Sequence, residues 1–189
     1  MKKLNRLIIL VMLILNTLFL TLTVLGKFDS NILVSLSLYI IVFLPTIIKK
    51  IFKIKIIDLA ELLFLIFIFL AQLLGSVMHF YGIISWYDSF VHFISGILSA
   101  LLAIYLLVLF NKYNKKSIAF NILFMFSISL MIAAGWEIFE FTADSLLGGN
   151  AQRALETGVR DTMKDIICAF MGSILIVIPY IYKLSENND

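Results

Sequence analysis

The sequence predicts an all-α protein that crosses a membrane several times, as a multi-pass bundle of six spanning helices with both termini on the inner side. Three observations support this fold class. The chain is too apolar for a soluble domain, because 62% of its 189 residues are hydrophobic and only 14% are charged. Six apolar runs each have close to the roughly 20 residues that an α-helix needs to cross a bilayer. Finally, lysine and arginine residues are distributed unevenly between the segments that join these runs.

The six runs use most of the chain and leave no room for a separate soluble domain, so we expect residues 1–189 to form a single integral membrane domain. The predicted spans are residues 7–25, 32–48, 59–81, 90–110, 118–141 and 166–182. The first run is longer than the roughly 7 to 15 apolar residues of a signal peptide, which favours a retained anchor over a cleaved one. No broken helix or inverted repeat is apparent in the sequence.

The orientation follows from the basic residues. With the N-terminus inside, eleven of the fifteen lysine and arginine residues fall in inner segments. The outer segments then hold only Lys27, Arg153, Arg160 and Lys164. The positive-inside rule therefore predicts that both termini lie inside. Because the basic groups are short and adjacent to spans, we expect contact with membrane lipids and no binding of nucleic acid.

The fifth predicted span ends in carboxylates, where lipid is expected. Glu137, Glu140 and Asp144 follow a spacing that places them on one face of a helix. A charged side chain inside a spanning helix costs roughly 2.5 to 3.5 kcal/mol on insertion scales, so these residues require a partner, a proton or a cation. Cys168 is the single cysteine, which excludes a disulfide within the chain and a thiolate metal cage.

Further polar residues fall at the outer ends of other spans. Asp88 and His92 are four residues apart, as are Asp161 and Asp165, so each pair shares a helix face. The predicted topology places these residues outside together with His79, Glu137, Glu140 and Asp144. Imidazole and carboxylate groups suit Zn²⁺, Mn²⁺, Fe²⁺ or Mg²⁺, and helical bundles build such sites from facing helices. A divalent metal is thus the predicted cofactor.

The leading hypothesis is a metal-dependent hydrolase or transferase that acts on a lipid or lipid-linked substrate at the outer leaflet. The metal would activate water or polarise a phosphoryl or acyl oxygen, and a second carboxylate would act as general base. The predicted metal ligands are His79, Asp88, His92, Glu137 and Asp161. The predicted catalytic residues are Glu140 and Asp165, and Arg153 or Arg160 would hold a lipid phosphate.

Other interpretations remain open. Asp88 and Asp161 taken singly suit helix caps, and Arg153, Arg160 or Lys164 would pair with the carboxylates in a purely structural cluster. The protein would then be non-enzymatic and use the cluster as an outer cap or to dock a partner. A transporter would use the same carboxylates to bind a cation or proton, although no chain of ionisable groups continues inward.

Two segments near the cluster have predicted structural roles. In the fourth span, the small residues Ser95, Gly96, Ser99 and Ala100 would let a neighbouring helix approach closely. The outer segment 144–164 contains a turn signal at residues 148–150. Residues 151–157 are predicted to form a short surface helix that carries Gln152 and Arg153.

The motifs together resemble a known family. They read His79-x8-Asp88-x3-His92-x3-Gly96, then Trp136-Glu137-x2-Glu140-x3-Asp144, then Gln152 and Asp161-Thr162-x2-Asp165. This pattern resembles the YjdF-like bacterial inner-membrane proteins over roughly the second half of the chain. The resemblance implies a multi-pass plasma-membrane protein with a shared polar motif, and it implies no particular reaction.

Overall fold

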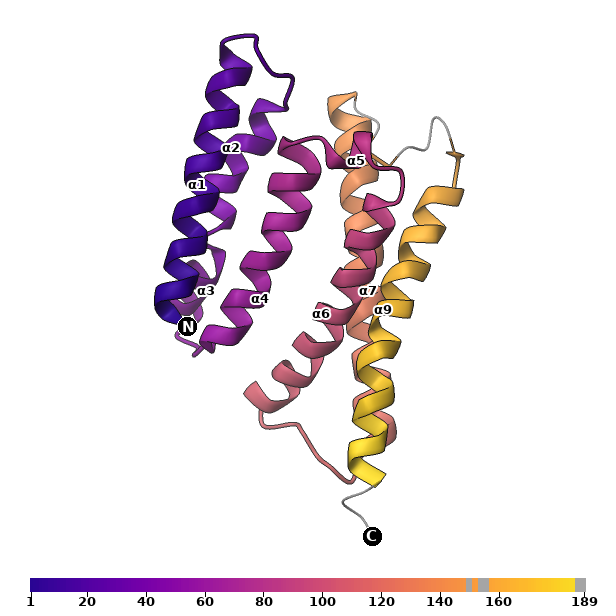
Figure 1. The fold of residues 1–189 in the computed structure, drawn as a ribbon. Helices are drawn as coiled ribbons and strands as arrows, with labels where there is room; N and C mark the ends of the chain where they lie inside the picture. The colour runs from indigo at the N-terminus through magenta and orange to yellow at the C-terminus, as the bar shows by residue number, and fades with distance from the viewer. Residues whose placement is uncertain (149–150, 153–156, 186–189) are drawn as a thin grey trace. The chain divides into compact units, whose positions relative to one another are not determined.

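The structure is a computed structural model that describes residues 1–148, 151–152 and 157–185 (Figure 1). All regular secondary structure within these residues is helical. The elements are α1 (Lys2–Val24), α2 (Ile32–Ile41), α3 (Leu44–Phe52), α4 (Asp58–Ile68), η1 (Phe69–Val77), α5 (Phe80–Ile83), α6 (Tyr87–Leu109), α7 (Ile118–Leu147) and α9 (Arg160–Ser185). The predicted surface helix at residues 151–157 falls largely outside the described residues. The all-α prediction is confirmed for the part of the chain that is described.

Within the described residues, five helical stretches are long and apolar enough to cross a membrane, and a sixth is added if a bent helix pair counts as one span. That pair is α2 and α3, which are inclined by 47° to each other within the predicted span 32–48. Pro45 stands in the first turn of α3. Proline has no N–H to donate and its ring clashes with the carbonyl four residues earlier, at Ile41, where α2 ends. The sequence interpretation that no helix is broken is therefore wrong for this segment.

Several helices extend beyond their apolar runs. Helix α7 continues from the predicted span to Leu147, and α9 begins at Arg160 instead of residue 166. Hydrophobicity marks only the part of a helix that lies in hydrocarbon, whereas the helical backbone continues into the interface. As a result, Asp144 and Asp161 are helical residues rather than loop residues.

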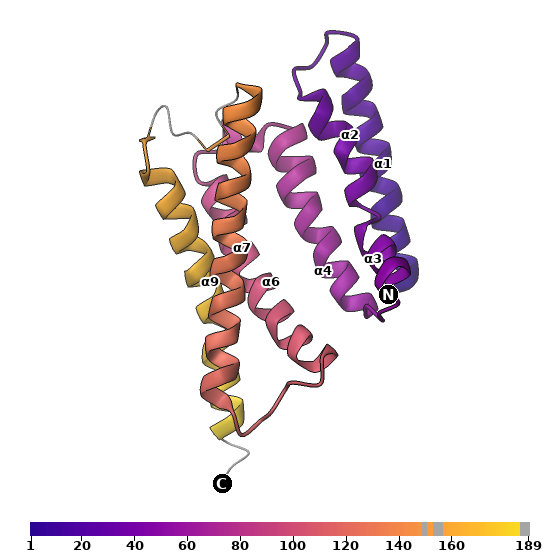
Figure 2. The ribbon, with the colours of Figure 1, turned by 180° about the vertical axis from the view of Figure 1, so that it is seen from behind.

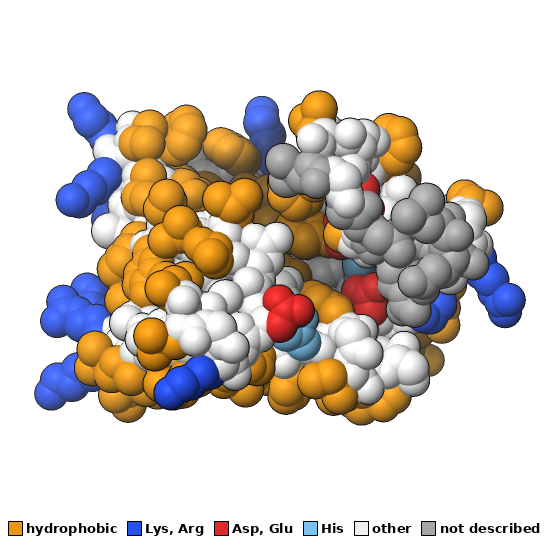
Figure 3. All heavy atoms as spheres, turned by 90° about the horizontal axis from the view of Figure 1, so that it is seen from above, with side chains coloured by type: hydrophobic (Ala, Val, Ile, Leu, Met, Phe, Trp, Pro, Cys, Tyr) orange, Lys and Arg blue, Asp and Glu red, His pale blue; other side chains and the backbone are white. Residues whose placement is uncertain are grey.

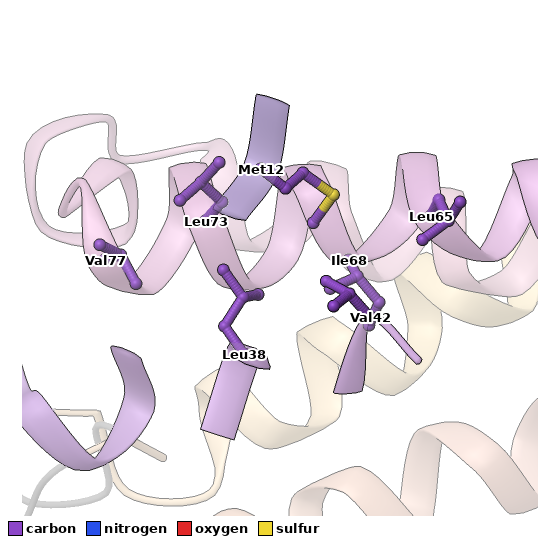
Figure 4. Close-up of a cluster of buried hydrophobic side chains, with 7 residues drawn as sticks. All are labelled: Met12, Leu38, Val42, Leu65, Ile68, Leu73 and Val77. Carbon is purple, nitrogen blue, oxygen red and sulfur yellow. The ribbon is translucent and has the colours of Figure 1, made fainter. Parts of the chain in front are cut away.

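The chain divides into two compact units, Met1–Asp88 and Ser89–Asp189, and the boundary falls in the first turn of α6. The first unit packs α1, α2, α4 and η1 around a hydrophobic core (Figure 4). Its buried members are Met12, Leu38, Val42, Leu65, Ile68, Leu73 and Val77. That all 189 residues form a single domain stays a prediction.

Polar side chains also join the helices of the first unit. The Nδ2 group of Asn16, fully buried on α1, donates a hydrogen bond of 2.9 Å to the backbone carbonyl of Ser35 on α2. On the π-helix η1, Gln72 Nε2 donates to Ser37 Oγ at 2.7 Å and to the Val34 carbonyl at 3.1 Å. Hydrogen bonds between helices contribute to association in a membrane, where water cannot replace them.

The Asn16 contact can be tested by substitution. We expect Asn16→Ala to lower the free energy of unfolding by about 1 kcal/mol, the scale measured for hydrogen bonds between membrane helices. Thermal unfolding of the detergent-solubilised protein measures the effect. Thr21→Ala on the same helix is the control, because the exposed Thr21 hydroxyl donates to the Thr17 carbonyl of its own helix and so does not join two helices. Equal stability of the two variants would contradict the expected contribution of Asn16.

The second unit places α6, α7 and α9 side by side, as both ribbon views show (Figures 1 and 2). Helices α6 and α9 approach so closely that no side chain fits at their crossing. A Cβ atom added to Gly96 would lie 1.8 Å from the Ala169 carbonyl oxygen, and one added to Gly172 would lie 2.0 Å from the Phe93 carbonyl oxygen. The predicted close approach of a neighbour at Gly96 is thereby confirmed, and it brings the polar ends of α6 and α9 together.

Candidate functional site

Three potential metal ligands meet where α6 and α9 begin. Asp88 and His92 lie on successive turns of α6, and Asp165 lies on α9. Each offers one ligand atom, and these atoms all lie within 4.8 Å of one another. His92 and Asp165 are buried, with 6% and 3% of their surfaces exposed, whereas Asp88 is partly exposed. We refer to Asp88, His92 and Asp165 as the ligand triad.

Glu137 on α7 lies beside this triad. Only 4% of its surface is exposed, and its Oε1 atom lies 3.9 Å from Nε2 of His92. This Oε1 atom is buried and has no hydrogen-bond partner among the described residues. Thr162 and Gln152 lie within hydrogen-bonding reach of the Glu137 carboxyl group. A buried carboxylate oxygen that lacks a hydrogen bond is costly, so this atom needs a proton, a water molecule or a cation.

Asp161 lies near the same cluster. It is buried in the first turn of α9, and its Oδ1 atom lies 3.8 Å from the half-exposed ammonium group of Lys164. The Asp161 carboxylate is also close enough to His92 and Glu137 to interact with them electrostatically. The fourth carboxylate of this region is therefore partly balanced by a cation on its own helix.

The two other acidic residues of the α7 motif have different contacts. Glu140 Oε1 accepts a hydrogen bond of 2.8 Å from the indole nitrogen of Trp136, on the exposed side of the helix. The carboxylate of Asp144 accepts the backbone N–H groups of Ala151 and Gln152 at 2.8 and 2.9 Å. Asp144 thus holds residues 151–152 near α7, and this explains how Gln152 reaches Glu137.

The remaining predicted residues are not members of the ligand triad, and one of them falls outside the described residues. His79 belongs to the first unit, where its Nε2 atom contacts the Asp29 carbonyl and its ring packs against Phe28 at 5.7 Å. Its backbone is left-handed, with φ of 62°, at the break between η1 and α5. Arg160 is exposed at the start of α9, and Arg153 lies outside the described residues.

The side chains of the triad are of the types that divalent metals bind, so the triad could hold a metal ion. Two carboxylates and one imidazole match the ligand preferences of Mn²⁺, Fe²⁺ or Zn²⁺, and carboxylates also suit Mg²⁺. Figure 3 views the chain from the end where α6 begins and α7 ends, and acidic and imidazole side chains are visible there among hydrophobic ones. Sequence reasoning did not assign Gln152 or Thr162 to the site, because hydrogen bonds from a loop and from another helix leave no periodic signal.

Comparisons with known proteins support the membrane character of the chain. A family described as "Predicted membrane protein (DUF2238)" matches residues 7–185. The chain is also similar to an uncharacterised protein of Thermotoga maritima, at 27% identity over 131 residues. That match covers 69% of this chain and 66% of the relative, slightly less than two thirds of the relative's length. No solved structure matches the chain. Because the family match covers nearly the whole sequence, the chain belongs to the DUF2238 family of predicted membrane proteins.

Proposed function

We propose that this membrane protein is a metal-dependent hydrolase or transferase that acts on a lipid or lipid-linked substrate at the outer face of the plasma membrane. One observation carries the proposal: the ligand atoms of Asp88, His92 and Asp165 lie within 4.8 Å of one another, between apolar helices. The buried Glu137 Oε1 atom beside them supports it independently. A bundle that only needed to span a membrane would gain nothing from burying such groups.

The outer location is supported by the distribution of charge. Eleven of fifteen basic residues fall on the inner side if the N-terminus is inside. In that orientation the beginnings of α6 and α9 lie outside. The substrate would then come from the outer leaflet or from the space beyond it.

The geometry favours a particular division of roles. Asp88, His92 and Asp165 would hold a divalent cation, which polarises a substrate carbonyl or phosphoryl oxygen and lowers the pKa of a water molecule. Glu137 is the best-placed general base, because its carboxylate lies beside His92 without belonging to the ligand triad. Glu140 is less suited to this role because it bonds to Trp136.

Metal content is the direct test. We expect the purified wild-type protein, supplied with metals and kept free of chelators, to retain about one equivalent of Zn, Mn or Fe as measured by elemental analysis. His92→Ala should retain at least tenfold less, because losing even an outer-shell partner typically costs 10- to 100-fold in affinity. His79→Ala is the matched control and should keep its metal, since its ring contacts Asp29 and Phe28.

The outcomes separate this proposal from a non-enzymatic role. Metal retained by wild type and lost from folded His92→Ala supports the site. A wild-type protein that binds no metal would instead favour a structural cluster or a docking surface, in which the pair formed by Lys164 and Asp161 stabilises the fold.

A cation transporter is the second candidate, and one observation favours it. Helices α2 and α3 form a broken segment, and broken helices accompany ion and substrate sites in many transporters. Reconstitution into vesicles tests this idea. Movement of a divalent cation or of protons that stops in Glu137→Gln would favour transport over hydrolysis.

A further inference from the structure

We infer that one end of the first unit binds the head groups of anionic phospholipids. The surface consists of residues 2–6 and 49–57, and we call it the basic surface. The inference goes beyond the proposed function, because it uses neither the ligand triad nor any reaction. Three features lead to it: the contacts that assemble the surface, its exposed basic side chains, and the exposed apolar side chains among them.

Side-chain contacts bring separate segments of the chain to this end of the unit. Asn5, buried on α1, donates from Nδ2 a hydrogen bond of 3.0 Å to the backbone carbonyl of Asp58, where α4 begins. Lys49 Nζ, in the last turn of α3, lies 2.6 Å from Oε2 of Glu61. Asp58 and Glu61 both belong to the first turn of α4, so the start of α1 and the end of α3 are held to the same turn (Figures 1 and 2).

The charged residues of this surface are basic. No acidic residue occurs in residues 2–6 or 49–57. The exposed basic side chains include Lys2, Lys3, Arg6, Lys50 and Lys53. Near a membrane that contains anionic lipid, each basic residue strengthens binding by about fivefold. Because these residues come from two segments that tertiary contacts bring to one end of the unit, their attractions for anionic head groups act together.

Large apolar side chains are exposed among these basic residues. Ile51 and Phe52 follow Lys50 at the end of α3, and 66% and 67% of their surfaces are exposed. The backbone of Lys53 is left-handed, with φ of 53°, and ends the helix. Lysine side chains beside exposed apolar residues on a short amphipathic helix are typical of segments that bind at the boundary between lipid head groups and acyl chains. The lysines would contact the head group, and Ile51 and Phe52 would contact the acyl chains.

A phospholipid with a net negative charge fits both features. Zwitterionic phosphatidylcholine has the same acyl chains and a phosphate, but its own ammonium group compensates the charge. A free phosphate ion has the charge and offers nothing to the exposed apolar side chains. Lipid is also the available partner, because α1 and the stretch Asp58–Val77 are long and apolar enough to cross a membrane, and both begin at this end of the unit. Charged side chains are excluded from hydrocarbon, so these helix ends meet head groups whichever side of the membrane they face.

Lipid titration of the full-length protein in detergent, followed by native mass spectrometry, tests the inference. The probes are phosphatidylglycerol and phosphatidylcholine with identical acyl chains, and we expect wild type to bind phosphatidylglycerol at least about tenfold more tightly. The triple variant Lys3→Gln/Lys50→Gln/Lys53→Gln should lose at least about tenfold in affinity for phosphatidylglycerol and keep its affinity for phosphatidylcholine. The matched control is Lys112→Gln/Lys115→Gln/Lys116→Gln, which removes the same charge from the linker between α6 and α7 and should bind phosphatidylglycerol as wild type does.

Three results would overturn the inference. Equal affinity of wild type for the two lipids would show that the head-group charge is not recognised, and this comparison needs no variant. Equal losses in the two triple variants would show that only the total charge of the protein matters. Displacement of phosphatidylglycerol by inorganic phosphate would show a site for the free anion, to which the apolar side chains contribute nothing. Metal content plays no part in these measurements, so the inference and the proposed function fail separately.

Discussion

The Gly96→Leu variant is expected to yield no folded second unit. A Cβ atom at position 96 would lie 1.8 Å from a carbonyl oxygen of α9, and a backbone atom cannot turn aside as a flexible side chain does. Helices α6 and α9 would therefore have to separate. Gly172 on α9 lies equally close to the backbone of α6, so the two glycines mark the same crossing. We expect a loss of more than about 3 kcal/mol, at or beyond the upper end of overpacking costs. Size-exclusion chromatography and thermal unfolding in detergent measure the result.

Gly135→Leu is the matched control. Gly135 lies within α7, and a Cβ atom added there would meet nothing within 4 Å. Leucine also has a higher helix propensity than glycine, so this variant should be at least as stable as wild type. If Gly96→Leu were as stable as Gly135→Leu, the close crossing of α6 and α9 would be contradicted.

The same crossing explains which part of the site could be predicted from sequence. The spacing of Asp88 and His92 places them on one helix face, and this local relation is encoded in the period of the helix. Their meeting with Asp165 depends on how closely α6 and α9 cross. Gly96 indicated a close contact with another helix. The sequence did not indicate which helix would pack there, or which of its residues would lie against Gly96.

Other differences arise from contacts that have no periodic signature. A single residue, Pro45, stands at the break between α2 and α3. The mean hydropathy of the surrounding apolar run does not reveal it. Glu137 was predicted as a metal ligand; the structure places it beside His92, 3.9 Å away, and the ligand role stays a prediction. Asp144 was predicted as part of the polar face, whereas its carboxylate binds two backbone N–H groups of the following segment. A sequence indicates which side chains are polar, and the tertiary fold decides what each one contacts.

Glu137→Gln is expected to keep its metal and to lose activity by 100- to 10,000-fold, the usual contribution of a general base. The amide has nearly the shape of the carboxylate and leaves the ligand triad of Asp88, His92 and Asp165 unchanged, but it cannot accept a proton. Elemental analysis and a hydrolysis assay on lipid substrates, made on the same preparation, separate the two properties. If the metal disappears together with activity, Glu137 is a ligand, as its sequence position first suggested.

Glu140→Gln, one turn further along α7, provides the control for that experiment. A glutamine oxygen still accepts the hydrogen bond from Trp136, so we expect a stable protein whose activity stays within a few-fold of wild type. If Glu140→Gln lost as much activity as Glu137→Gln, the assignment of proton transfer to Glu137 would be contradicted. Full activity in a folded, metal-loaded Glu137→Gln protein would exclude general-base catalysis by Glu137. The buried Glu137 side chain would then have only a structural role.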